Sequence, residues 1–150
     1  MRAGRLGLRT RDEGSGMMKS DEELIEELRK ATDGLLFMSE SDYPFEIIKW
    51  GKAGDISQEY VREIVKGAAE TTVEEITVDD FFRSAAAEQE WKAAPELAAA
   101  KRHQKLVRLL KENLTEVRVY RVGERNIGVY IVGRSGEGNA LGVSTRVVET

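Results

Sequence analysis

The chain has 150 residues, of which 41% are hydrophobic and 33% charged, and its net charge is −4. This composition is typical of one globular domain with a densely charged surface. Because the sequence contains no cysteine and only one histidine, His103, it excludes disulfides, thiolate nucleophiles, Cys-ligated metals and His-rich metal sites, and it argues against most enzymes.

The charge is unevenly distributed along the chain. Residues 1–16 hold four arginines and two acidic residues, so the remaining residues carry a net charge of −6. A surface of that sign repels the phosphate backbone of nucleic acids and attracts basic proteins. We therefore expect a protein partner and no direct binding of nucleic acid.

Residues 1–17 lack the apolar run of a secretory signal, and no segment approaches the length of about 18 apolar residues that spans a membrane. We interpret residues 1–17 as a disordered arm or a misassigned start, and residues 18–150 as one domain. We expect the protein to be cytoplasmic, without a membrane association, and monomeric when free.

The first predicted helix covers Asp21–Thr32. Ser20 and Glu23 have the spacing of a capping box, apolar residues then recur on one helical face, and Gly34 follows as the C′ residue. The apolar run Leu35–Met38 and the polar run Ser39–Pro44 predict a loop that is held at both ends.

A short strand is predicted over Phe45–Trp50, followed by a turn over Gly51–Gly54. A second helix begins at Asp55 or Ser57 and extends to Gly67. The alternation over Val73–Val78 predicts another strand, and a short helix starting at Asp79–Asp80 carries Phe81 and Phe82.

Pro95 suits the first turn of a long helix that extends to about Asn113. Three strands follow, at about 116–122, 127–132 and 141–148, and their short polar connections predict an antiparallel meander. These elements predict an α/β or α+β fold in which helices cover a mostly antiparallel sheet.

Three features could serve in binding. Glu40, with Asp42 nearby, offers a carboxylate on a supported loop, although an ordinary acidic turn is the alternative. Trp91, beside Glu90 in a weakly patterned segment, suits an interface or the edge of a core. Thr150 could deliver a carboxylate and a hydroxyl at the end of a strand, or could simply fray.

His103 is the one candidate for general-base catalysis. It lies in the middle of the long predicted helix among Lys101, Arg102 and Lys105, so we predict that it is a surface residue. A hydrolase that uses His103 as its base is the enzymatic alternative, but no nucleophile or orienting acid is identifiable around it.

The segment Ala31–Glu46 (ATDGLLFMSESDYPFE) and the ending Gly142–Thr150 (GVSTRVVET) closely resemble the nuclease A inhibitor family. Phe81–Phe82, Gln104–Leu106 and Val119–Glu124 occur between them in matching order. The resemblance covers about residues 18–150.

The resemblance implies an α-β-α sandwich that inhibits a sugar-non-specific, Mg²⁺-dependent DNA/RNA endonuclease of the ββα-metal type. It implies that Glu40 stands in for the scissile phosphate and that the oxygens of Thr150 bridge to the catalytic Mg²⁺ of the nuclease. Glu90-Trp91 matches the Asp-Trp pair of a second contact patch, with glutamate in place of aspartate. The protein would need no cofactor of its own.

Glu90 stands where the family has aspartate, and residues 1–17 lie outside the family pattern. These two differences leave a second interpretation open. In this alternative, the chain is a non-inhibitory binding module of the same fold that recognises another basic protein.

Overall fold

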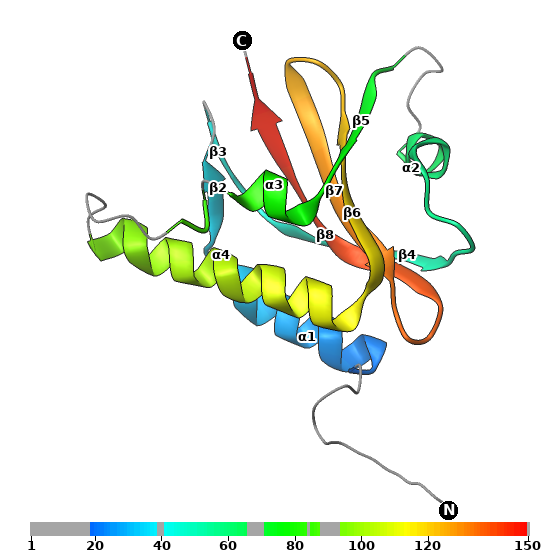
Figure 1. Cartoon of the computed structure of the whole chain (residues 1–150), viewed down its shortest axis with the longest axis horizontal. Coiled ribbons are helices and arrows are strands. Elements are labelled where there is room, and N and C mark those ends of the chain that lie inside the picture. Colours follow the sequence, from blue (N-terminus) through cyan, green and yellow to red (C-terminus); the bar gives the residue numbers. More distant parts are fainter. Residues whose placement is uncertain (1–18, 39–40, 66–70, 84, 88–93, 150) are drawn as a thin grey trace, which may run out of the picture.

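The structure, a computed structural model, describes residues 19–38, 41–65, 71–83, 85–87 and 94–149. These residues form four helices and two antiparallel sheets (Figure 1). The helices are α1 (Asp21–Thr32), α2 (Gln58–Ile64), α3 (Val78–Phe82) and α4 (Ala94–Asn113). The strands are β2 (Leu36–Met38), β3 (Asp42–Pro44), β4 (Glu46–Lys52), β5 (Val73–Ile76), β6 (Thr115–Val122), β7 (Asn126–Arg134) and β8 (Asn139–Val148).

The main sheet has five strands in the order β4-β8-β7-β6-β5, and every neighbouring pair is antiparallel. Strands β6, β7 and β8 follow one another along the chain and lie side by side, which confirms the predicted C-terminal meander. Strand β4 joins the sheet beside β8, and β5 joins at the opposite edge beside β6. Strands β2 and β3 form a separate two-stranded hairpin.

Both faces of the main sheet are covered by helices. Successive residues of a strand point to opposite faces, and Val119 and Tyr120 accordingly belong to two different buried clusters. Helices α1, α3 and α4 pack on the face of Val119, whereas Val61 of α2 packs on the face of Tyr120. The fold is therefore an α+β sandwich with helices on both sides of an antiparallel sheet.

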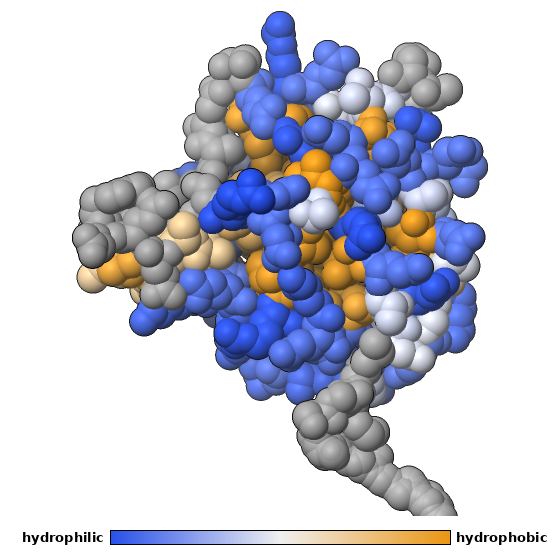
Figure 2. Space-filling view, viewed as in Figure 1, coloured by the Kyte–Doolittle hydropathy of each residue, from blue (hydrophilic) through white to orange (hydrophobic). Residues whose placement is uncertain are grey.

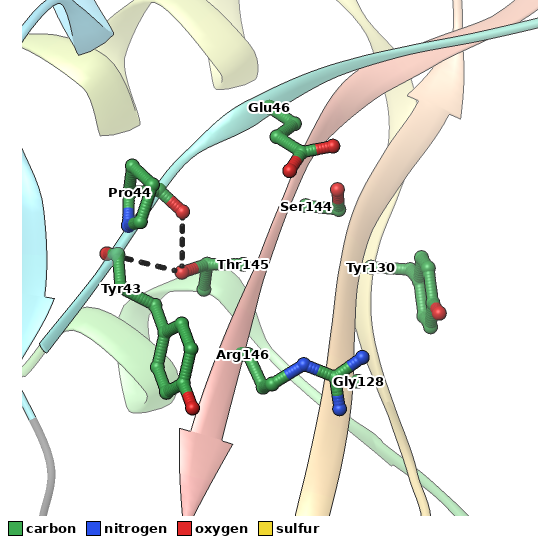
Figure 3. Close-up of a pocket in the computed structure, with 8 residues that line it drawn as sticks. All are labelled: Tyr43, Pro44, Glu46, Gly128, Tyr130, Ser144, Thr145 and Arg146. Atoms are coloured by element: carbon green, nitrogen blue, oxygen red, sulfur yellow. Dashed lines mark hydrogen bonds between the residues drawn. The ribbon is translucent and has the colours of Figure 1, made fainter. Parts of the chain in front are cut away.

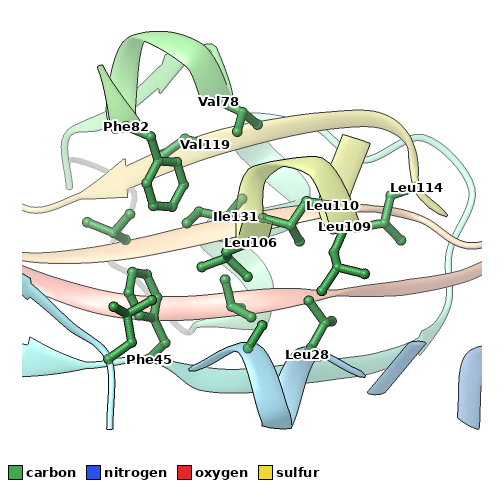
Figure 4. Close-up of a cluster of buried hydrophobic side chains, with 14 of the residues drawn as sticks. Leu28, Phe45, Val78, Phe82, Leu106, Leu109, Leu110, Leu114, Val119 and Ile131 are labelled. Carbon is green, nitrogen blue, oxygen red and sulfur yellow. The ribbon is translucent and has the colours of Figure 1, made fainter. Parts of the chain in front are cut away.

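The larger cluster forms the main hydrophobic core (Figure 4). Leu28 of α1 and Leu106 and Leu110 of α4 meet Val119 and Ile131 of the sheet there, and all five side chains are fully or almost fully buried. Burial of such side chains contributes about 1.5–3 kcal/mol each, so this layer holds α1 and α4 against the sheet.

Local signals in the sequence placed the first two helices. Ser20 and Glu23 form the predicted capping box, and Gly34 follows α1 with a positive φ of 71°. For α2, the hydroxyl of Ser57 accepts a hydrogen bond from the Tyr60 amide, so Ser57 is the N-cap. The helix extends to Ile64; the predicted end at Gly67 lies outside the described residues.

Three other boundaries differ from the predictions. The segment 35–44 contains the β2–β3 hairpin instead of a loop alone. Strand β4 continues through Gly51, whose φ of 84° accommodates an irregularity in its pairing with β8. The hydroxyl of Thr77 accepts from the Asp80 amide and caps α3, so β5 ends at Ile76 and the helix begins before Asp79.

Hydrophilic side chains cover most of the face in Figure 2, and an apolar group lies over the start of α4. Among the described residues, the large hydrophobic side chains that are exposed are Leu36 and Ile64. None of the helices in the described part of the chain is long and apolar enough to cross a membrane.

Candidate functional site

The four predicted contact residues, Glu40, Glu90, Trp91 and Thr150, lie outside the described residues. Residues 1–17, predicted to be an arm or a misassigned start, lie outside them as well. The structure does describe the residues that flank each contact residue, and these flanks fix where the three contact segments join the fold. The contacts of these flanking residues therefore show how each contact segment is attached to the rest of the fold.

The flanks of Glu40 are the strands β2 and β3. They pair in register, with Phe37 opposite Tyr43, and one of them is hydrogen-bonded to the main sheet. The hydroxyl of Thr145, on β8, donates to the carbonyl oxygen of Pro44 at 2.9 Å and lies 3.4 Å from that of Tyr43. The two ends of the segment that contains Glu40 are therefore the two strands of a hairpin, and this hairpin is hydrogen-bonded to β8.

An aromatic cluster lies under this hairpin. The ring of Phe37, on β2, stacks on Phe81 of α3 with a centroid separation of 4.4 Å. It also makes edge contacts with Phe45, Phe82 and His103 at 6.0–6.2 Å. Since His103 belongs to α4, this one cluster joins the hairpin to both α3 and α4.

The prediction that His103 is a surface residue is wrong. Its side chain is buried, with 4% exposure, and it packs against the rings of Phe37, Phe45 and Phe82. Its Nδ1 lies 2.9 Å from the carbonyl oxygen of Ala99, one helical turn earlier. This position is that of a core residue, and it gives no support to His103 as the base of a hydrolase.

The flanks of Glu90 and Trp91 are also attached to the aromatic cluster. On the N-terminal side, the Ala86 amide donates to the Phe82 carbonyl at 2.8 Å, and Gln104 of α4 donates to the Ala86 carbonyl at 2.7 Å. On the C-terminal side, α4 begins at Ala94. Both ends of the segment that contains Glu90 and Trp91 are therefore fixed to α3 and α4.

The flank of Thr150 is the end of β8. Val148 is the last residue of the strand and pairs with Asn126 of β7. The next amide, that of Glu149, donates to the Arg125 carbonyl at 2.9 Å. The carboxylate of Glu149 also pairs with the Arg121 guanidinium at 2.5 Å, a contact between distant residues for which the sequence contains no local signal.

A polar hollow of about 270 Å³ lies on the sheet beside β3 (Figure 3). Its lining consists of Tyr43, Pro44, Glu46, Gly128, Tyr130, Ser144, Thr145 and Arg146. A Cβ at Gly128 would lie 2.8 Å from the Tyr130 hydroxyl oxygen, so the glycine leaves room for the Tyr130 ring in its present position. With charges of both signs and several hydroxyls, this surface suits polar contacts with another protein better than enclosure of an apolar ligand.

Burial perturbs two tyrosines of the smaller cluster, Tyr60 of α2 and Tyr120 of β6. Desolvation raises the pKa of Tyr60 and of Tyr120, and the negative charge of Glu75 raises that of Tyr120 further. The Tyr120 hydroxyl donates to the Ile56 carbonyl at 3.2 Å, which is a structural contact. Across the described residues, no three His, Cys, Asp or Glu side chains form a group that could hold a metal ion.

The comparison with known families decides the affiliation. The family model described as nuclease A inhibitor-like protein matches residues 22–150. The chain belongs to the nuclease A inhibitor-like family. None of the curated proteins compared with the chain matches it. Membership of the nuclease A inhibitor-like family supports a role as a nuclease inhibitor in general terms, with a nuclease as the protein partner.

Proposed function

We propose that this protein inhibits a sugar-non-specific, Mg²⁺-dependent endonuclease of the ββα-metal type by blocking its active site. It acts as a cytoplasmic monomer and binds the nuclease rather than the nucleic acid. The observation that carries the proposal is the match to the nuclease A inhibitor-like family over residues 22–150, a range that includes Glu40, Glu90, Trp91 and Thr150.

Glu40 is the proposed mimic of the scissile phosphate. A carboxylate carries negative charge, as a phosphodiester does, but it has no phosphorus centre to be attacked. It can therefore occupy the active site without being cleaved. The hairpin that flanks Glu40 supports this role, because the hydrogen bond from Thr145 to Pro44 and the stacking of Phe37 on Phe81 restrain its two strands. A restrained support lowers the entropy lost on binding.

Thr150 is the proposed contact to the metal of the nuclease. Mg²⁺ in such enzymes is held by few protein ligands and keeps several waters, and it prefers oxygen ligands. The hydroxyl and carboxylate of a C-terminal threonine can replace waters of that kind. The attachment of Glu149 to Arg125 and Arg121 supports this role, since it fixes the residue that precedes Thr150.

Trp91 is the proposed apolar contact, with Glu90 as the polar member of the same patch. Exposed tryptophans at interfaces often cost about 2 kcal/mol or more when truncated to alanine. The attachments of Ala86 to Phe82 and Gln104 support a fixed position for one end of this segment. The acidic body adds a long-range attraction to a basic nucleic-acid groove, which salt weakens.

Substitution of Glu40 tests the phosphate mimic. We expect Glu40→Gln to weaken nuclease binding about thirtyfold or more while leaving thermal unfolding unchanged, because removal of a buried interfacial charge commonly costs about 2 kcal/mol or more. Asp42→Asn is the matched control, since Asp42 is an exposed acid on the same hairpin. Equal affinities of Glu40→Gln and the wild-type chain would refute the role of Glu40.

Extension of the chain by two glycines after Thr150 tests the metal contact. The extension converts the terminal carboxylate to an amide and moves the new terminus away from the metal. We expect it to lower the affinity for the Mg²⁺-loaded nuclease and to have less effect when EDTA has removed the metal. Unchanged inhibition by the extended chain would show that Thr150 does not reach the metal.

A second candidate function follows from Glu90. The family pattern has aspartate at this position, and glutamate is longer by one methylene, which changes the reach of the carboxylate. In this alternative the chain binds a basic protein without inhibiting a nuclease. Full nuclease activity in the presence of an excess of the chain would favour it, and Glu90→Asp would then be expected to restore inhibition.

A further inference from the structure

The end of β8 is held by an ion-pair network as well as by backbone hydrogen bonds. The Arg121 guanidinium of β6 contacts two carboxylates, Glu149 at 2.5 Å and Glu74 of β5 at 3.5 Å. Glu74 lies directly opposite Arg121 in the β5–β6 register, whereas Glu149 follows the last residue of β8. Because β7 lies between β6 and β8, the Arg121 side chain spans a whole strand to reach Glu149.

The Arg121 side chain is less exposed than either of its two partners. The Arg121 side chain retains 21% of its exposed area, whereas those of its partners Glu74 and Glu149 retain 58% and 51%. The arginine is thus the restrained member of the network, and Glu149 is the member that projects from a chain end. Terminal residues fray unless they are tied down, and the Glu149 backbone has one hydrogen bond to do so among those described.

We propose that Arg121 is a positioning residue of the inhibitory site, which acts by holding Glu149 so that Thr150 is delivered to the metal of the nuclease. This inference rests on the proposed function of Thr150. Arg121 touches neither the metal nor the nuclease in this role. It fixes the preceding residue before binding, so that less conformational freedom remains to be lost when the complex forms.

A double-mutant cycle between Arg121 and the chain terminus separates positioning from stability. The four proteins are the wild-type chain, Arg121→Met, the chain extended by two glycines, and the extended chain with Arg121→Met. Their dissociation constants are measured with one Mg²⁺-loaded nuclease, and their thermal unfolding is recorded in parallel. We expect Arg121→Met to weaken binding about tenfold in the native-length chain, the factor that corresponds to about 1.4 kcal/mol. In the extended chain, we expect the same substitution to change binding by less than about twofold.

Two controls keep the test specific. Arg118→Met removes another arginine of β6, which pairs with Glu75 at 3.6 Å on the opposite face, and we expect it to leave the affinity unchanged. Glu149→Gln removes the other end of the contact at an exposed position, so it remains informative if Arg121→Met destabilises the fold. We expect its loss of affinity to match that of Arg121→Met and not to add to it.

The possible failures are distinguishable. An equal loss from Arg121→Met in the native-length and extended chains would assign Arg121 a general structural role and overturn the inference, as would the absence of any loss. Both results leave the role of Thr150 intact if the extension by itself weakens binding. If the extension has no effect, the proposed contact of Thr150 fails first, and the inference falls with it.

Discussion

Truncation of Phe37 should detach the hairpin from the body of the protein. Phe37→Ala removes a ring that stacks on Phe81 at 4.4 Å and contacts Phe45, Phe82 and His103. Truncation of a fully buried phenylalanine costs about 3–5 kcal/mol, and Phe37 is half-buried. We therefore expect a loss of about 2–3 kcal/mol, of which the stacked pair accounts for about 1 kcal/mol.

This loss should be concentrated in the hairpin. Strands β2 and β3 form only three residue pairs, and an isolated two-stranded hairpin is marginally stable in water. Without Phe37, the hydrogen bonds of the Thr145 hydroxyl to Tyr43 and Pro44 still link the hairpin to the main sheet. We expect amide hydrogen exchange in β2 and β3 to accelerate by more than that in β7, and nuclease affinity to fall with it.

Leu36→Ala is the matched control for Phe37→Ala. Leu36 is the preceding residue of β2, but its side chain is 42% exposed, so its truncation should cost about 0.5 kcal/mol or less. Hairpin exchange that is as slow in Phe37→Ala as in the wild-type chain would show that the aromatic cluster does not hold the hairpin. A uniform acceleration in β2, β3 and β7 would show that Phe37 serves the whole fold.

Substitutions at three further positions test the stability of the fold. Burial raises the pKa of Tyr120 in the folded protein above its ordinary value of about 10. The contribution of this shift to the free energy of unfolding is therefore full below about pH 10 and is lost as the pH rises through the raised pKa. Urea unfolding should show this decline in stability, and Tyr120→Phe should make the decline smaller. Tyr120→Phe should also cost about 1 kcal/mol at pH 7, through loss of the bond to Ile56. Ser20→Ala should lower stability by about 1 kcal/mol, because it removes the capping box of α1; an unchanged urea midpoint would contradict that role. Gly142→Ala should prevent stable folding, because the new Cβ would overlap the Ile131 carbonyl oxygen; a normal melting temperature would show that β7 and β8 can separate there.

Local signals predicted the elements that short-range physics determines. The capping box at Ser20 and Gly34 define α1 within its own sequence, and the alternating strands with polar turns define the meander. The β2–β3 hairpin was missed because its stability comes from residues far along the chain. Its strands pair over three residues only, and Thr145, about a hundred positions later, hydrogen-bonds to Pro44.

The predicted surface position of His103 is wrong because the helical phase of this residue, and not the charge of its sequence neighbours, determines its burial. Lys101, Arg102 and Lys105 flank it, but three-residue steps place His103 between the buried Ala100 and Leu106. Arg102, the residue before His103, donates to the Ala31 and Asp33 carbonyls at the C-terminal end of α1.

The candidate site also contains residues that the sequence predicts and residues that only the fold brings together. Glu40, Glu90, Trp91 and Thr150 were predicted from the family resemblance, and their roles stay predictions. Arg121 and Glu149 had no such signal, because they are 28 positions apart and become neighbours only when β6, β7 and β8 assemble. The family resemblance therefore predicts the contact residues, whereas the residues that we propose to support them come together only in the assembled fold.

Titration of a nuclease with the purified wild-type chain tests the central claim most directly. The enzyme is a Mg²⁺-dependent, sugar-non-specific ββα-metal endonuclease from the source organism, and cleavage of both DNA and RNA is followed. We expect both activities to fall together and to reach zero near one equivalent of inhibitor. Undiminished cleavage of both substrates at a large excess, by this nuclease and by a panel of related enzymes, would contradict the account.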